Sequence, residues 1–245
     1  MSDNIITGDG SRTLFCESVG EHYHSTKDGA FSEALYKHVL PAWKYRINGR
    51  KRVVVLDLCF GLGYNTFVLL WYLRRQNYSG HLQIISPEHD EALLLSLINF
   101  PYPDEFSEFV PIIRAIAEKR CYQTPALSLE VFAEEARSWL AEYQGPVDIV
   151  FHDPFSPVHN HQLWTRQYFA ELKRIGAPDL LVTTYSTATA VRMGLFENGF
   201  HIYENRPEAL VRSATMASLT SLSLEEIDMP LKQQRNPAAA SLKDN

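Results

Sequence analysis

The stretch KRVVVLDLCFGLGYNT, residues 51–66, decides the fold of this chain. Residues 53–58 form an apolar and β-branched run with Asp57 near its end, which is typical of a strand buried on both faces of a parallel sheet. A turn with Gly61 and Gly63 follows, and then comes an apolar segment, FVLLWYLRR, whose basic end suits a helix C-terminus. This order of strand, glycine turn and helix predicts an α/β fold whose backbone approaches a ligand closely at the turn.

The turn differs from two common nucleotide-binding motifs. It lacks the third glycine of the dinucleotide-binding fingerprint and the Gly-Lys-Ser/Thr of a P-loop. The acidic Asp57 before the glycines instead suits a cationic nucleoside that carries an amino acid, such as S-adenosylmethionine. Its carboxylate can order the loop or meet the ligand's ammonium group, and N–H groups at the helix start can meet the ligand's carboxylate. The alternative is an ordinary tight turn that binds nothing.

Composition and charge narrow the class of protein. The 245 residues suffice for one α/β domain with an extension, and 45% apolar and 21% charged residues are ordinary for a globular protein. No apolar run reaches the roughly 20 residues of a membrane span, and the polar start does not read as a signal peptide. Three widely spaced cysteines favour reduced thiols and a cytoplasmic location. A net charge of −6 argues against a general polyanion binder.

Polar residues follow several of the other predicted strands, which span 81–86, 126–132, 147–152, 179–184, 200–204 and 210–219. Open α/β sheets bind ligands outside the carboxyl ends of their strands. Glu88 stands where a carboxylate accepts hydrogen bonds from ribose hydroxyls in nucleotide-binding folds of this kind. Glu135 is either an adenine-binding acid or a carboxylate in the first turn of a helix. Asp153, followed by two prolines, indicates an active-site loop or, alternatively, a capped proline-rich turn.

The remaining segments flank this sheet. Residues 1–50 are predicted to be an N-terminal extension, either a lid over the ligand site or a structural cap on the sheet. Residues 51–228 form the main domain, and the polar residues 229–245 are predicted to be disordered. His159 and His161 are two apart on a loop without a third ligand, so we expect no metal site.

Several stretches together carry a resemblance to one family: GEHYHSTKDGAFSEAL, DLCFGLGYN, Pro87-Glu88, LEVFAEEARSWL, VDIVFHDPFSPVHNHQLWT and ATAVRMGLFENGF. The spacing of Asp153, Phe155, Pro157, Asn160 and Trp164 is the most specific part. Through these stretches, about residues 8–220, the chain resembles the MnmC-like tRNA methyltransferases, which finish 5-methylaminomethyl-2-thiouridine at the tRNA wobble position.

The resemblance implies a fold and an activity. The fold is that of class I S-adenosylmethionine-dependent methyltransferases, a mostly parallel seven-stranded sheet with helices on both faces and an N-terminal extension. The activity is N-methylation of the aminomethyl group on the modified wobble uridine of tRNA. The FAD-dependent oxidase of the bifunctional members is absent from this sequence, so a separate enzyme is expected to supply the aminomethyl precursor.

The resemblance also implies roles for single residues. Those that would bind the donor are Asp57, Gly61, Gly63, Asn65, Glu88, Glu135, Ala136 and Asp153. Those that would bind the substrate are Tyr23, His24, Glu33, Phe155 and Pro157. Asp153 and Phe155 would be the catalytic residues, with the carboxylate orienting the amine and the ring packing on the base. Glu134-Glu135-Ala136 stands where the family usually has Gly-Asp-Ala.

Two other functions remain open on the same fold. One is a methyltransferase for a small molecule or a protein, and the other is a non-catalytic subunit that binds the donor. For tRNA, binding is predicted to be salt-sensitive because it needs phosphate contacts. The cations predicted to supply them are His22, His24, Lys27, Lys37, His38, Lys44, Arg46, Arg50, Lys51, Arg52, Arg206 and Arg212.

Overall fold

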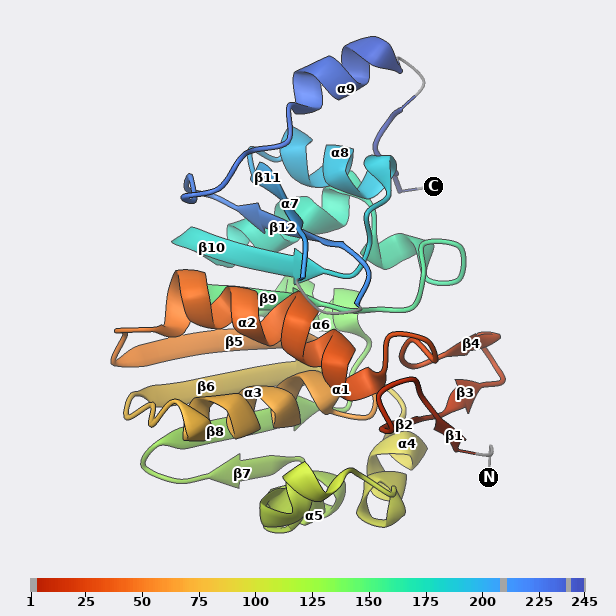
Figure 1. Cartoon of the computed structure of the whole chain (residues 1–245), viewed down its shortest axis with the longest axis vertical. Coiled ribbons are helices and arrows are strands. Elements are labelled where there is room, and N and C mark those ends of the chain that lie inside the picture. The colour runs from red at the N-terminus through yellow and green to blue at the C-terminus, as the bar shows by residue number, and fades with distance from the viewer. Residues whose placement is uncertain (1–3, 208–210, 237–238, 245) are drawn as a thin grey trace.

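An eight-stranded sheet forms the centre of the computed structural model (Figure 1), which describes residues 4–207, 211–236 and 239–244. Its strands are β5 (Arg52–Leu58), β6 (His81–Pro87), β7 (Cys121–Gln123), β8 (Leu127–Phe132), β9 (Val147–His152), β10 (Gly176–Thr184), β11 (His201–Asn205) and β12 (Ala214–Ser218). The order across the sheet is β11-β12-β10-β9-β5-β6-β8-β7. The run from β10 to β8 is parallel, whereas β12 and β7 pair antiparallel with their neighbours. The mostly parallel α/β sheet predicted from the sequence is confirmed.

The sheet has one strand more than the seven expected. The additional strand, β7, forms a hairpin with β8 at the edge of the sheet. The turn is closed by a hydrogen bond from Thr124 N to Leu127 O of 2.7 Å. Strand β7 is only three residues long and no residue in it is fully buried. It therefore lacks the alternating apolar pattern by which a half-buried strand is identified in a sequence.

Helices cover both faces of the sheet. They are α3 (Tyr64–Arg75), α4 (Glu91–Ser96), η3 (Leu97–Asn99), η4 (Asp104–Phe109), α5 (Val110–Lys119), α6 (Ala136–Glu142), η5 (His161–Leu163), α7 (Arg166–Arg174), α8 (Thr189–Glu197) and α9 (Met229–Arg235). Because side chains alternate along a strand, Val53 and Val55 enter the core shared with α3 and α5. Val54 and Leu56 enter the opposite core, shared with α6, α7 and α8.

The N-terminal extension has two parts with different places in the fold. Its first part forms two small hairpins, β1 (Ile5–Ile6) with β2 (Arg12–Thr13) and β3 (Phe15–Cys16) with β4 (Glu21–His22). Its second part is one helical rod made of α1 (Ala30–Glu33), η1 (Ala34–Val39), α2 (Leu40–Ala42) and η2 (Trp43–Ile47). The rod packs beside α3 and buries Ala34, Val39 and Ile47 completely, so it caps one face of the sheet.

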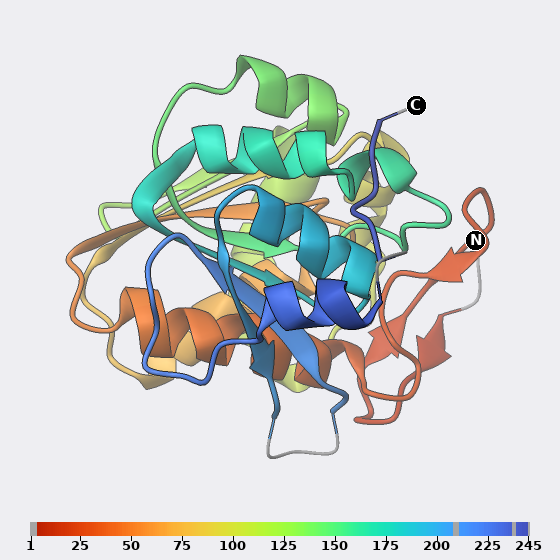
Figure 2. The same ribbon diagram turned by 90° about the horizontal axis from the view of Figure 1, so that it is seen from above.

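The predicted disorder of residues 229–245 is wrong for the part that the structure describes. Helix α9 begins at Met229, and the side chain of Asp228 caps it by accepting from Leu231 N. Figure 2 shows α9 beside α8, where the Met229 side chain is fully buried. Arg166 N donates to Leu242 O over 2.8 Å. The polar composition of this segment hid the two apolar side chains, Met229 and Leu242, that anchor it.

None of the described helices is long and apolar enough to cross a membrane.

Candidate active site

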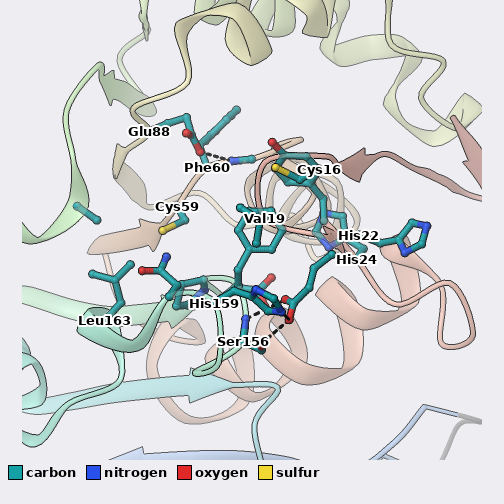
Figure 3. A pocket seen from close by; sticks show the side chains of 18 of the residues that line it. Cys16, Val19, His22, His24, Cys59, Phe60, Glu88, Ser156, His159 and Leu163 are labelled. Atoms are coloured by element: carbon teal, nitrogen blue, oxygen red, sulfur yellow. Dashed lines mark hydrogen bonds and ion pairs between the residues drawn. The ribbon is translucent and has the colours of Figure 1, made fainter. Parts of the chain in front are cut away.

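A cavity of about 870 Å³ lies at the carboxyl ends of the parallel strands (Figure 3). Its walls come from Cys16 and residues 18–27 of the extension and from the segments after β5, β6, β8 and β9, namely 59–61, 87–90, 134–136, 153–156, 159–160 and 162–163. Glu33 of α1, Asn65 of α3, Tyr185, which follows β10, and Arg212 complete the lining. The volume is in the range of small-molecule sites, roughly 300–1,000 Å³.

The glycine turn forms one wall of the cavity and is held by Glu88. Gly61 has φ of 54° and Gly63 has φ of 73°, a backbone region that side chains rarely adopt. A Cβ at Gly61 would lie 3.2 Å from the Tyr23 ring, whereas one at Gly63 would meet the Phe67 and Phe60 rings at 2.6 and 2.8 Å. Gly61 thus lines the cavity, and Gly63 lies outside it as a structural turn residue.

Asp57 is buried beneath the turn and does not line the cavity. Thr66 Oγ1 donates to Asp57 Oδ2 over 2.7 Å, and the Ser86 hydroxyl donates to the Asp57 carbonyl oxygen. Burial raises the pKa of Asp57 to about 7. Of the two roles that the sequence left open for this carboxyl group, its position favours ordering the loop over contacting a ligand.

Glu88 is a buried carboxylate with both oxygens held by backbone donors. Gly61 N donates to Glu88 Oε2 and Asp90 N donates to Glu88 Oε1, each over 2.9 Å. Burial raises the pKa of Glu88, and the two N–H donors act in the opposite direction. The contact with Gly61 joins the end of β6 to the glycine turn after β5. The Glu88 carboxylate therefore lines the cavity in a fixed position.

Glu135 has the role of a helix cap and also lines the cavity. Its Oε2 accepts from Arg137 N and Ser138 N over 3.0 and 2.9 Å at the start of α6. The helix-terminal role, one of the two alternatives in the sequence, is therefore present. Glu135 and Ala136 both face the same cavity as Glu88.

Asp153 and Asn65, predicted from separate motifs, meet at the floor of the cavity. Asn65 Nδ2 donates to Asp153 Oδ2 over 2.9 Å. Burial is the main reason why the pKa of Asp153 lies well above its usual range, and the nearby carboxylates of Glu33 and Asp57 raise it further. The Asn65 hydrogen bond and the Lys37 charge work in the opposite direction.

The loop after β9 is rigidly held. Trp164, fully buried, donates its indole N–H to Phe155 O over 2.8 Å. The Tyr185 hydroxyl donates to Pro154 O over 3.1 Å. Phe155 itself lines the cavity, whereas Pro157 lies outside its walls and stiffens the loop through its fixed φ.

The extension closes onto this loop. The Tyr23 and Phe155 rings lie 5.1 Å apart between centroids. The Glu21 carboxylate accepts from the Ser156 N–H over 3.0 Å and from the Ser156 hydroxyl. The three predicted substrate residues of the extension, Tyr23, His24 and Glu33, all line the cavity.

A buried ionic cluster supports the extension from below. Lys37 Nζ donates to Glu33 Oε1 over 2.6 Å and to Asp28 Oδ2 over 3.0 Å. Arg212 Nε reaches the same Asp28 oxygen at 3.0 Å. The cluster joins the helical rod to the segment before β12, so a change in any member should affect how the extension sits over the cavity.

Sequence reasoning missed several residues of the site. Glu21, Cys59 and Tyr185 line the cavity. Lys37 and His38, predicted only as phosphate-binding cations, are buried beside the site residues Glu33 and Asp153. Tyr185 was open to detection, because it follows a predicted parallel strand as Glu88 and Asp153 do. Glu21 and His38 gave no such signal, since their positions depend on how the extension packs.

Most of the cations predicted to bind phosphates are placed elsewhere. Lys37, His38 and Arg46 are buried, and Arg50 pairs with Asp148 at 2.9 Å. Lys51 and Arg52 stand at the start of β5, at the amino end of the parallel strands and therefore opposite the cavity. The members of the predicted set that line the cavity are His22, His24, Lys27 and Arg212.

Among the residues that the structure describes, no group of three or more His, Cys, Asp or Glu side chains is arranged to hold a metal ion.

Comparison with known proteins identifies the family. A family profile described as S-adenosyl-L-methionine-dependent methyltransferase matches residues 104–220. The crystal structure of MnmC2 from Aquifex aeolicus superposes with a TM-score of 0.87, at 32% identity, over 100% of this chain and 79% of that chain. The chain belongs to the MnmC-like methyltransferases. The resemblance, the fold class and the methyl donor inferred from the sequence are thereby confirmed: this is an enzyme that uses S-adenosylmethionine.

Other relatives of this MnmC-like enzyme are longer. It is 29% identical over 219 residues to an uncharacterized protein of Methanocaldococcus jannaschii, covering 87% of this chain and 58% of that protein. It is 30% identical over 207 residues to the tRNA 5-methylaminomethyl-2-thiouridine biosynthesis bifunctional protein MnmC of Azoarcus sp., covering 78% of this chain and 31% of that protein. The MnmC-like chain thus spans less than two thirds of either relative.

Proposed function

We propose that this enzyme N-methylates the aminomethyl group on the modified wobble uridine of tRNA. The observation that carries the proposal is the pairing of a buried carboxyl group with two neighbouring aromatic rings, tilted by 54° to each other, in one cavity. Asp153 can accept hydrogen bonds from a primary amine, and Tyr23 and Phe155 offer an aromatic face to a base. Enzymes that act on a base take it out of its stack and hold it between such rings.

We propose that the donor lies along the strand ends between the glycine turn and α6. The residues proposed to contact it are Gly61, Asn65, Glu88, Glu135, Ala136 and Asp153. Three observations support the fit: the cavity volume, the close backbone approach that Gly61 permits, and acidic groups facing a cationic ligand. Asp57 and Gly63 are proposed to act indirectly, by shaping the turn.

The proposed chemistry needs an aligned and neutral amine. When bound, S-adenosylmethionine supplies an electrophilic methyl group, so that the amine lone pair forms the N–C bond as the C–S bond breaks and leaves its electron pair on sulfur. Asp153 orients the amine by accepting a hydrogen bond from its N–H group. After methyl transfer, the same carboxylate takes the proton that the secondary ammonium releases. Holding the two reactants in line contributes roughly 7–11 kcal/mol to lowering the barrier.

We propose that residues 4–29 act as the lid of this site. Tyr23 and His24 form its inner side, next to Glu33 of α1, and the Glu21 contacts with Ser156 tie it to the catalytic loop. Lys27 and Arg212 at the rim are the cations proposed to meet tRNA phosphates. A separate enzyme is proposed to supply the aminomethyl precursor.

A second acceptor is favoured by one observation. The net charge is −6, and several cations of the first quarter are buried or paired with carboxylates. A surface with few free cations suits a small amine better than a polyanion. The competing proposal is therefore methylation of a free aminomethyl nucleoside or another small primary amine at the same cavity.

Transfer of a labelled methyl group distinguishes the two acceptors. The protein is incubated with S-adenosylmethionine and with either whole tRNA from cells lacking the terminal methyl group or the free aminomethyl nucleoside. We expect tRNA to accept the label with the larger kcat/KM. A larger kcat/KM for the free nucleoside would establish the small-amine function instead.

A further inference from the structure

His38 lies outside the cavity, directly behind Asp153, and is fully buried. Its Nδ1 is 2.8 Å from Thr183 Oγ1. Its Nε2 is 3.8 Å from Asp153 Oδ1 and has no hydrogen-bond partner among the described residues. An unsatisfied buried polar atom is costly, so the position of this nitrogen beside the carboxyl group proposed to be catalytic points to a use.

The helical rod places His38 in an uncommon way. Segment η1 has the wider turn of a π-helix, and in it the consecutive residues Lys37 and His38 are both buried. Lys37 points to Glu33 and Asp28, whereas His38 packs on Phe151 with ring centroids 5.5 Å apart. Single π-helical turns are found frequently at functional sites.

Thr183 sets the tautomer of the His38 ring. The threonine hydroxyl has one hydrogen, and its possible acceptors are His38 Nδ1 at 2.8 Å and Val150 O at 3.5 Å. Donation from the hydroxyl to Nδ1 is the favoured direction, because the reverse direction would leave the hydroxyl hydrogen only the Val150 contact of 3.5 Å, at the outer limit of a hydrogen bond. With Nδ1 as acceptor, the ring hydrogen sits on Nε2 and points toward Asp153. Burial and the Lys37 charge keep the ring neutral by lowering the pKa of His38.

We propose that His38 is a positioning residue of the methyl-transfer reaction: its Nε2–H holds Asp153 Oδ1 while the substrate amine binds Oδ2. This inference rests on the proposed function. Asn65 already donates to Oδ2 over 2.9 Å, so the two donors together fix the plane of the carboxyl group. The gap of 3.8 Å closes by a small rotation of the Asp153 side chain, as catalytic hydrogen bonds often tighten when substrate binds.

The arrangement serves both protonation states of Asp153. Ionised, the carboxylate accepts from Nε2–H at Oδ1 and from the amine at Oδ2. After transfer, the secondary ammonium gives one proton to Oδ2, and Oδ1 of the neutral acid still accepts from Nε2–H. The histidine gains and loses no proton, so the proton count balances on the amine and Asp153 alone.

Two substitutions at His38 separate positioning from packing. His38→Phe keeps a planar ring in the core and removes the Nε2–H, whereas His38→Gln keeps an N–H donor. We expect His38→Phe to bind S-adenosylhomocysteine normally and to lose roughly tenfold to hundredfold in kcat, and His38→Gln to recover part of that loss. A His38→Gln enzyme no more active than a folded His38→Phe enzyme would overturn the proposal.

The pH profile gives a readout that a purely structural role does not move. A donor to Asp153 favours its charged form, so removing it should shift the acidic limb of kcat/KM in His38→Phe to higher pH. The other titratable groups facing His38 are Lys37, His24 and His152, and those facing Asp153 are Glu33, Asp57 and Lys37. All stay in place in the variant. If the acidic limb of the kcat/KM profile lay at the same pH in His38→Phe and in the wild type, the inference would be contradicted.

A double-mutant cycle tests whether His38 acts through Asp153. The kcat of the double variant His38→Phe/Asp153→Asn should be close to that of Asp153→Asn alone, since the positioned carboxylate is then already gone. If the fold losses in kcat of the two single variants multiplied in the double variant, His38 would act by another route and the proposal would be overturned.

A measurement without any acceptor keeps this inference separate from the proposed function. The ¹⁵N NMR signals of the His38 ring, assigned by their loss in His38→Gln, report which nitrogen carries the hydrogen. We expect Nε2–H in the wild-type protein and a changed Nε2 signal in Asp153→Asn. An Nδ1–H tautomer would overturn the role of His38 even if tRNA is methylated, whereas failed methylation of tRNA together with Nε2–H would count against the acceptor alone.

Discussion

At Asp153, the surroundings of the side chain decide its chemistry more than its residue type does. Asp57 and Glu88 are also buried carboxyl groups, but Thr66 holds the first beneath the turn and backbone N–H groups hold the second at its edge. Asp153 alone of the three combines a side-chain amide donor, an unpartnered histidine nitrogen close by and a face toward the cavity. It is therefore the group proposed to meet the amine.

Asp153→Asn keeps the shape of the side chain and removes its charge. We expect donor binding to be nearly intact and turnover to fall roughly 10²-fold or more, the range for a positioned acid–base group. Single-turnover methylation and thermal melting on one preparation measure both properties. If Asp153 only caps a turn, the variant would lose stability while turnover stays near normal.

Asp57 should make stability depend on pH. Its pKa is raised from 3.8 to about 7 in the folded protein, so the folded state keeps a proton that the unfolded state releases between these values. The free energy of unfolding contributed by Asp57 therefore falls as pH rises from about 4 to 7 and is constant above that. The change amounts to a few kcal/mol, at about 1.4 kcal/mol per pKa unit.

Asp57→Asn isolates this contribution, because the other titrating groups are common to both proteins. Denaturant unfolding at pH 4.5 and 7.5 should show the variant gaining stability relative to the wild type at the higher pH. If the difference in free energy of unfolding between variant and wild type were the same at pH 4.5 and pH 7.5, Asp57 would titrate in its ordinary range.

Among the elements, the glycine turn after β5 lines the cavity with its backbone at Gly61. Gly61 and Gly49 both have positive φ, 54° and 83°, but only Gly61 lines the cavity. A side chain at Gly49 would meet nothing within 4 Å. A substitution at either glycine therefore strains the backbone in the same way, but only the new side chain at Gly61 enters the cavity.

Gly61→Val should weaken S-adenosylmethionine binding, and Gly49→Val should not. Both variants should lose stability through backbone strain, by about 1–2 kcal/mol. Calorimetry of donor binding, with melting curves for both proteins, makes the comparison. Equal donor affinity in a folded Gly61→Val protein would remove the turn from the donor site.

The sequence predicted the elements whose pattern is local. The parallel strands and the helices after them follow from apolar runs and their period, and Asp153, Glu88 and the glycine turn follow from strand ends. The short edge strand β7 and helix α9 were missed because their stability comes from packing and not from their own pattern. His38 and Glu21 reach the site only through the packing of the extension, which no local pattern reveals.

For the whole molecule, charge is the property that most limits the choice of acceptor. Two exposed lysines lie at opposite ends of the parallel strands: Lys27 of the extension at the rim of the cavity, over the carboxyl ends, and Lys51 before the amino end of β5. If tRNA binds over the cavity, only the first meets phosphates.

Lys27→Gln should weaken tRNA binding and make its salt dependence shallower by roughly 0.7–0.9 in log K against log salt, the range for one phosphate contact in single-stranded and duplex nucleic acid. Lys51→Gln is the matched control and should change neither the tRNA affinity nor its salt dependence. Binding titrations at several salt concentrations measure the slopes. A flat salt response of the wild-type protein would argue against a tRNA substrate.

The most direct measurement of the central claim is mass spectrometry of the nucleosides in tRNA before and after incubation with the enzyme and S-adenosylmethionine. The tRNA comes from cells that stop at the aminomethyl stage, and Asp153→Asn serves as the inactive control. We predict that the aminomethyl wobble uridine gains one methyl group with the wild-type enzyme and far less with the variant. No gain on that nucleoside, or a gain on another nucleoside, would contradict the proposed function.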